Sequence, residues 1–178
     1  MNEAKAIALV RKGNTDAFAE IVECYQAPIF RYLYRMTGEW ELARDLAQDT
    51  FLKAYKNILK TDSNLSFKAW LYRIATNNAL QHYRRKRLIS FIPLVDSVQN
   101  ECVDEVSHKR IEDKLAIEEA LLKIPKDQKV CFVLHFVEGF KYREIADILG
   151  IKEDAVRKRV ARGSNEFKRI YRQTGVRE

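Results

Sequence analysis

Apolar residues recur every three or four positions along most of the chain, which is the spacing of one face of an α-helix. A first stripe covers residues 18–36, preceded by N-cap candidates at 14–16 and followed by Gly38. Further stripes cover residues 42–58 and 67–87. Strand-like alternation is not evident, and glycine and proline number only 6 and 3. The pattern therefore predicts an all-α protein.

The helical pattern is interrupted between residues 88 and 111, where the sequence contains a proline and a net acidic charge. It resumes in residues 112–178 with shorter helical units. The formal charge of +7 divides into +6 for residues 1–87, −2 for 88–111 and +3 for 112–178. We therefore predict two small helical domains, 1–87 and 112–178, joined by a flexible linker at 88–111. Two basic domains point to a polyanionic partner such as nucleic acid.

Several classes of protein are excluded by other features. No apolar run approaches the ~18 residues of a membrane-spanning helix, and the first residues lack the pattern of a signal peptide, so a cytoplasmic location is expected. The three cysteines are far apart and lack metal-ligand spacing, so no disulfide, metal or cofactor is expected. An enzyme acting on nucleic acid would have to use His82, His108 or His135, which lack metal-site spacing, and the chain has no phosphate-binding glycine loop. We assign no catalytic residue and no small-molecule substrate.

The strongest local signal is a pair of helical units at residues 141–150 and 151–172. Gly150, Val156 and Val160 have the spacing of a helix-turn-helix, with the glycine supplying the positive φ of the turn. Burial of the two valines leaves cations on the opposite side of the second helix, as in a recognition helix that reads guanine in the major groove. The candidates for duplex DNA binding are Arg157, Lys158, Arg159, Arg162 and Lys168. The alternative is an ordinary solvated basic face, and two acidic residues at the helix start would repel a nearby phosphate.

A second signal lies on the helix predicted at 41–58, on the side opposite its apolar stripe. This face combines carboxylates, an amide and two cations with one apolar residue, Leu52, that is out of place on a solvated surface. Such a mixed face suits a partner helix of another protein better than DNA. Its members are Asp45, Gln48, Asp49, Leu52, Lys53 and Lys56. The alternative is a plain solvated face with one stray leucine.

A third signal is the segment 66–87, which combines a tryptophan and other aromatic residues with two adjacent asparagines and four terminal cations. Aromatic rings stack on unpaired bases and amides bond to base edges, so the segment suits single-stranded nucleic acid. The candidates are Trp70, Arg73, Asn77, Asn78, Arg84, Arg85, Lys86 and Arg87. Because asparagine is a poor helix former, a break or loop is expected at 77–78. The alternative is that Trp70 is a core residue and the four cations are only a soluble helix end.

Together these segments resemble the extracytoplasmic-function (ECF) sigma factors of bacterial RNA polymerase, which belong to the sigma-70 family. Residues 17–38 and 41–58 are similar to regions 2.1 and 2.2 of that family, and residues 67–87 to regions 2.3 and 2.4. Residues 118–170 are similar to region 4. The resemblance spans nearly the whole chain in the family's order, so it implies a sigma factor that directs RNA polymerase to promoters and performs no covalent chemistry.

The resemblance also implies roles for the candidate residues. The face at residues 45–56 would dock on the clamp helices of the largest subunit of core RNA polymerase, and region 4 would contact the flap. Asn77 would hold a flipped base of the minus-10 element beside the cations at 84–87, while the cations at 157–168 would face the minus-35 element. An anti-sigma factor, either free or membrane-bound, would cover the same faces. One departure is Asp-Ala at residues 154–155, where the family usually has Gly-Thr, and this leaves the promoter sequence open.

The remaining alternative is a conventional helix-turn-helix regulator that does not bind core polymerase. It accounts for residues 141–169 equally well, but it does not explain the asparagines and cations of 66–87. Binding to core polymerase separates the two hypotheses.

Overall fold

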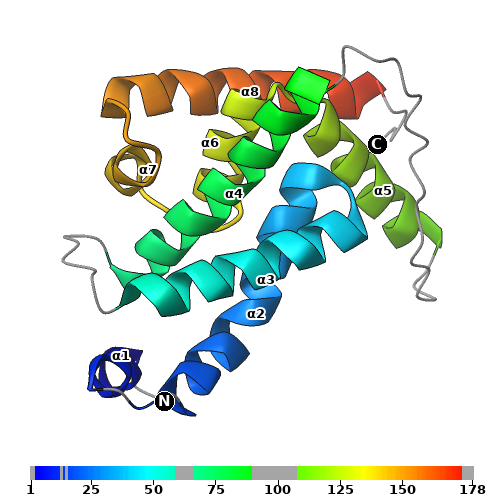
Figure 1. Cartoon of the computed structure of the whole chain (residues 1–178). Helices are drawn as coiled ribbons and strands as arrows, with labels where there is room; N and C mark the ends of the chain where they lie inside the picture. The colour runs from blue at the N-terminus through cyan, green and yellow to red at the C-terminus, as the bar shows by residue number, and fades with distance from the viewer. Residues whose placement is uncertain (1–2, 13, 15, 59–65, 90–107, 174–178) are drawn as a thin grey trace.

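The computed structural model describes residues 3–12, 14, 16–58, 66–89 and 108–173 of the chain. Within these ranges all regular structure is helical, which confirms the predicted fold class (Figure 1). The helices are α1 (Glu3–Arg11), α2 (Asp16–Thr37), α3 (Trp40–Asn57), α4 (Phe67–Ile89), α5 (His108–Lys123), α6 (Lys126–Phe136), α7 (Tyr142–Leu149) and α8 (Glu153–Gln173). Helices α1–α4 pack together, and so do α5–α8.

The start and end of α2 follow from local chemistry. The Asn14 side-chain oxygen accepts hydrogen bonds from the backbone N–H groups of Asp16 and Ala17, at 3.0 and 3.2 Å, and so satisfies donors that the helix leaves unpaired. Gly38 follows the helix with a φ of 75°, a conformation that favours glycine. The sequence predicted both boundaries. It did not predict α1, which packs against α2 through buried Ala6 and other apolar residues.

Helix α4 is continuous through Asn77 and Asn78, so the expected break at this point is wrong. The Asn78 side chain is 5% exposed and is hydrogen-bonded to Thr50 and Lys53 on α3. These tertiary bonds satisfy the amide that would otherwise compete for the backbone, and they offset the low helix propensity of asparagine.

In the C-terminal half, α8 packs against both α6 and α7, and the helix-turn-helix has the predicted form. Gly150 joins α7 to α8 with a φ of 65°, and Val156 and Val160 are buried. Helix α8 also approaches α6 closely at Gly163, where a β-carbon would lie 3.1 Å from the backbone oxygen of Gln128. Gly163 was not predicted as a packing residue, although it interrupts a strongly helical basic segment.

The two halves pack on one another, with α5 and α6 against α2, and α7 against α4 (Figure 1). Buried residues of both halves form one hydrophobic cluster, and the rings of Tyr72 and Phe140 meet edge-on across the boundary at 5.1 Å. Helix α4 extends to Ile89 and α5 begins at His108, so the ends of the predicted linker 88–111 are helical. Its remaining residues, 90–107, lie outside the described ranges.

Candidate DNA and polymerase interfaces

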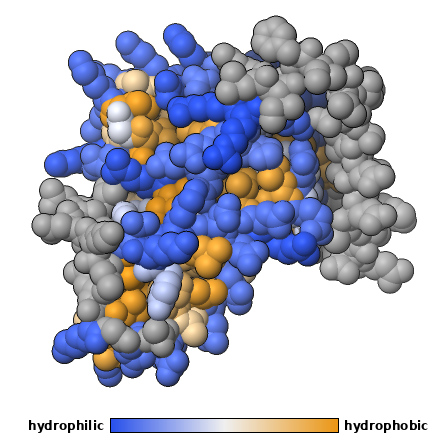
Figure 2. All heavy atoms as spheres, in the orientation of Figure 1, coloured by the Kyte–Doolittle hydropathy of each residue, from blue (hydrophilic) through white to orange (hydrophobic). Residues whose placement is uncertain are grey.

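The mixed face of α3 lies on the surface, as the sequence predicts. Asp45, Gln48 and Asp49 are exposed, and Leu52 is 50% exposed despite being apolar. Beside Leu52 an open groove of about 700 Å³ runs between α2 and α3, and Figure 2 shows apolar side chains gathered where these two helices cross. The groove is lined by Phe18, Val22, Gln26, Ala27, Phe30, Arg44, Ala47, Gln48, Phe51, Leu52 and Tyr55.

The α2 side of this groove escaped the sequence analysis. Val22 belonged to the apolar stripe at 18–36 and Tyr55 to the stripe at 42–58, whereas Phe30 was in neither, and Tyr55 is 44% exposed at the groove. A single-helix pattern cannot distinguish the apolar floor of an open groove from a closed core. The two cations of the face differ as well, because Lys56 points to solvent whereas Lys53 donates a hydrogen bond to Asn78.

Helix α4 divides its candidate residues into surface and interior. Arg73 and Asn77 are exposed one turn apart, so they share a face. Trp70 is partly buried and its ring lies 5.5 Å from that of Phe67, which supports a packing role as well. Asn78 is interior, which removes it from any surface that could contact a base.

The cations at the end of α4 remain at the surface. Arg84 and Arg85 are exposed, and Lys86 is exposed but pairs with Glu39 at 3.6 Å. The side chain of Arg87 lies outside the described part of the structure. The exposed face of α4 therefore combines one amide with several cations.

The outer face of α8 is narrower than the sequence predicted. Lys158, Arg162 and Lys168 are exposed, whereas Arg159 is turned toward α6, where it pairs with Asp127 at 3.6 Å. Arg159 is turned toward α6 because it follows buried Val156 by three residues, which places it nearer to the buried side of α8.

Arg157 is held in place by its neighbours. It pairs with Glu153 at 2.5 Å, one turn earlier, and its guanidinium lies 5.1 Å from the centre of the Tyr142 ring. Glu153 was expected to favour the helix dipole and to repel a nearby phosphate, and in the structure it also pairs with the first arginine of α8.

The described residues contain no group of three or more His, Cys, Asp or Glu side chains that could hold a metal ion. Two of the histidines considered for catalysis have other contacts: His135 Nδ1 lies 2.9 Å from the backbone oxygen of Phe140, and the His82 ring packs near Tyr83. Across the described ranges, every helix is too short or too polar to cross a membrane.

Comparison with known proteins identifies the family of the chain. The Sigma-70 region 2 model matches residues 21–89, and the Sigma-70, region 4 model matches residues 114–165. The chain is 32% identical over 179 residues to the ECF RNA polymerase sigma factor SigW of Bacillus subtilis, covering 94% of this chain and 96% of SigW. The chain belongs to the ECF sigma factors of the sigma-70 family. It directs promoter recognition by RNA polymerase, and it is not an enzyme.

Two solved structures share the fold of this sigma factor. One is the sigma factor RpoE in complex with the anti-sigma factor NepR from Bartonella quintana, with a TM-score of 0.71, 22% identity, and coverage of 87% of this chain and 96% of that one. The other is CnrH in complex with the cytosolic domain of CnrY, with a TM-score of 0.68, 22% identity, and coverage of 94% and 96%.

Region 4 contacts region 2 of this sigma factor through a buried carboxylate. Glu138, in the turn after α6, accepts a hydrogen bond from the Tyr72 hydroxyl at 2.6 Å and pairs with Arg35 at 3.5 Å. Lys68 donates to the backbone oxygen of Glu138 at 3.0 Å and lies 4.7 Å from the centre of the Phe140 ring. Burial, together with the nearby Glu138 carboxylate, raises the pKa of Tyr72 far above its ordinary value, so its hydroxyl remains a donor.

A buried lysine forms the second polar contact between the regions. Lys129 is 3% exposed and donates to the backbone oxygens of Leu122 and Met36, at 3.2 and 3.4 Å. Burial, with a smaller contribution from Lys126, lowers its pKa to about 8. Neither Glu138 nor Lys129 was a candidate from the sequence, although a lysine inside the apolar run of α6 was a visible signal.

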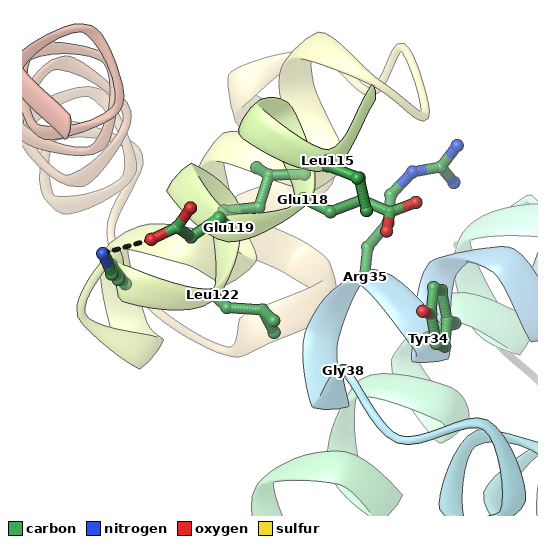
Figure 3. Close-up of a pocket in the computed structure, with 9 residues that line it drawn as sticks. Tyr34, Arg35, Gly38, Leu115, Glu118, Glu119 and Leu122 are labelled. Atoms are coloured by element: carbon green, nitrogen blue, oxygen red, sulfur yellow. Dashed lines mark hydrogen bonds and ion pairs between the residues drawn. The ribbon is translucent and has the colours of Figure 1, made fainter. Parts of the chain in front are cut away.

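Two cavities follow the same boundary. One, of about 480 Å³, lies between the end of α2 and α5, where Leu122 points toward Gly38 and Glu119 pairs with Lys123 at 2.5 Å (Figure 3). The other, of about 730 Å³, is lined by Arg84 of α4 and Arg159 of α8 among others. Helices α4 and α8 therefore both line one cavity in this arrangement.

Proposed function

We propose that this sigma factor docks on core RNA polymerase through the exposed α3 face and its groove. The proposal rests on one observation. Exposed Asp45, Gln48 and Asp49 lie on the same face as half-exposed Leu52, at the edge of an apolar groove. A clamp helix of the largest subunit fits this surface, because its apolar side chains would fill the groove while its cations pair with the carboxylates. Lys53 and Lys56 lie at the end of the same face.

The DNA-reading roles are divided between α4 and α8. We assign capture of an unstacked minus-10 base to Asn77, with Arg73 and Trp70 beside it and the cations at 84–87 on the phosphates. On α8, Arg157, Lys158 and Arg162 face the minus-35 element, and Lys168 contacts the backbone. Asn78 and Arg159 are left out of direct DNA contact because one is buried and the other faces α6.

Reading both elements requires the two regions to separate. Elements centred about 25 base pairs apart lie about 85 Å apart along B-form DNA, whereas α4 and α8 line one cavity here. A fully extended segment of the length of 90–107 spans at most about 60 Å. The two regions can therefore move far apart, provided that the helices on either side of this segment also move. An anti-sigma factor, free or membrane-bound, would act in the cytoplasm by covering the polymerase and DNA faces, and the two similar solved structures support such a partner because each is a complex with an anti-sigma factor.

The docking proposal is tested with Leu52→Asp, which places a charge at the edge of the groove. Its matched control is Leu9→Asp on α1, another exposed leucine. Fluorescence-detected titration with core polymerase should show at least a tenfold weaker affinity for Leu52→Asp, since a buried uncompensated charge costs more than ~1.4 kcal/mol, and an unchanged affinity for Leu9→Asp. Equal affinities for both variants would refute the assignment of this face.

A further inference from the structure

A buried polar chain connects α3 to α4 beneath the proposed polymerase and minus-10 faces. The Asn78 amide nitrogen donates to Thr50 Oγ1 at 3.0 Å, and the Asn78 oxygen accepts from Lys53 Nζ at 2.5 Å. Thr50 is fully buried and its hydroxyl donates to the backbone oxygen of Leu46 at 2.7 Å. Both ends of the asparagine amide are thereby used within region 2.

The chemistry of this position requires an explanation. A buried site on a helix is ordinarily apolar, because burying an amide is unfavourable unless it is hydrogen-bonded and asparagine is a weak helix former. Here both the amide nitrogen and the amide oxygen have partners on the neighbouring helix. Such a residue fixes the register and rotation of α4 against α3 more narrowly than a leucine would, because the bonds are directional.

The two ends of this series of hydrogen bonds lie at the proposed polymerase and minus-10 faces. Asn77, the base-binding candidate, directly precedes Asn78 and points outward. Lys53 directly follows Leu52, the apolar residue of the proposed polymerase face, and it is the only cation of that face that donates to α4 among the described residues. A docked polymerase helix therefore meets the lysine that holds Asn78.

We propose that Asn78 is a positioning residue that holds Asn77 in its base-accepting orientation and, through Lys53, links polymerase docking to minus-10 capture. This rests on the proposed function of the α3 and α4 faces. When core polymerase binds, it keeps the Lys53 side chain hydrogen-bonded to the Asn78 oxygen. This bond fixes the position of α4 while the minus-10 base is captured. Loss of either side chain removes the same link.

The test uses the full chain assembled with saturating core polymerase on a promoter carrying 2-aminopurine in its minus-10 element. Asn78→Leu and Lys53→Met are expected to slow opening by about tenfold each, and the double variant by no more than either alone, because residues of one hydrogen-bond chain are non-additive. Lys56→Met removes a cation from the same face without touching α4, and its effect should be confined to core affinity. Thermal melting of each variant reports any loss of folding.

A second variant keeps the proposal falsifiable when Asn78→Leu unfolds region 2. Asn78→Asp retains an acceptor for Lys53, so it should open promoters at close to the rate of the parent protein, and in the Lys53→Met background it should open them no faster than Lys53→Met alone. Multiplicative effects of the two single changes, or faster opening when Asn78→Asp is added to Lys53→Met, would overturn the link. Failure of the docking face itself is seen separately, in the core affinity of Leu52→Asp.

Discussion

The contact between Tyr72 and Glu138 offers a direct test of what holds region 4 against region 2. Tyr72→Phe removes only the hydroxyl that donates to the Glu138 carboxylate at 2.6 Å and keeps the ring packed against Tyr32 and Phe140. We call the arrangement in which region 4 packs on region 2 closed. In it, the Glu138 carboxylate of this variant would keep only its ion pair with Arg35, whose side chain is 3.5 Å away and 30% exposed. Arg35 pairs with Glu138 Oε1, the oxygen that Tyr72 does not reach, and this oxygen accepts no hydrogen bond in the described structure. Leaving a buried carboxylate short of its donor costs about 2 kcal/mol.

That cost falls on the closed arrangement alone, because the carboxylate becomes solvated once the regions separate. A change of about 2 kcal/mol multiplies the open-to-closed ratio by about 30, so an open population of about 1% would rise to roughly a quarter. The measurement is single-molecule energy transfer between a dye on exposed Cys24 and one on Asn165→Cys, with Cys102→Ser in the background. The variant should show a larger low-transfer population at neutral pH.

Tyr83→Phe is the matched control, because the Tyr83 hydroxyl donates to the backbone oxygen of Met36 within region 2, whereas the variant keeps the ring that Lys126 of region 4 approaches at 3.9 Å. Its open population should match that of the parent protein. An unchanged distribution for Tyr72→Phe, or an equal shift in both variants, would refute the reasoning that this carboxylate holds the regions together.

Three further predictions concern region 4. Lys129 has a pKa lowered from 10.5 to about 8, so between these values the unfolded chain binds more protons than the folded one and stability rises with pH. Urea titrations should show a contribution of about 1 kcal/mol from Lys129 between pH 8 and 9. Cys131, whose pKa is raised from 9.0 to about 11, offsets roughly a third of this gain over the same range, and Lys129→Met should remove the gain. Gly163→Ala places a β-carbon 3.1 Å from the Gln128 oxygen and 3.2 Å from Phe132 Cβ, so thermal melting should show about 1–3 kcal/mol of destabilisation, and an unchanged melting temperature would mean that α6 and α8 separate freely. Arg162→Ala should cost about 1–3 kcal/mol of binding free energy at one base pair of the minus-35 element, measured by competition binding. Arg159→Ala is the control and should not change base preference. An equal loss of affinity of Arg162→Ala for all sequences would mean that Arg162 contacts a phosphate and not a base.

The helices and their buried faces were accessible from the sequence because helix periodicity is a local property. Gly38 and Gly150 were recognised as ends of helices because positive φ values favour glycine. The inner valines of α8 and the exposed Leu52 of α3 were also placed correctly, since each follows from its spacing along a single helix. The resemblance to a sigma factor drew on the same local patterns, taken in order along the chain.

The partners of the polar side chains required the tertiary structure. Asn78 looked like a helix breaker and a base contact, but residues 25 and 28 positions away in sequence supply its hydrogen bonds. Arg159 looked equivalent to Arg162, but it pairs with Asp127 of α6. Each outcome depends on which helix lies opposite, and neither propensity nor spacing along one helix contains that information.

The same division explains the boundary between the two regions. The acidic segment between two basic halves indicated two domains, but the sequence did not predict how these domains contact each other. Glu138 meets Tyr72 across 66 positions, and Lys129 meets Met36 across 93, so no short pattern records either contact. Hydrophobic periodicity along this chain determines which face of each helix is buried, whereas only the packing of distant helices decides which buried polar groups find a partner.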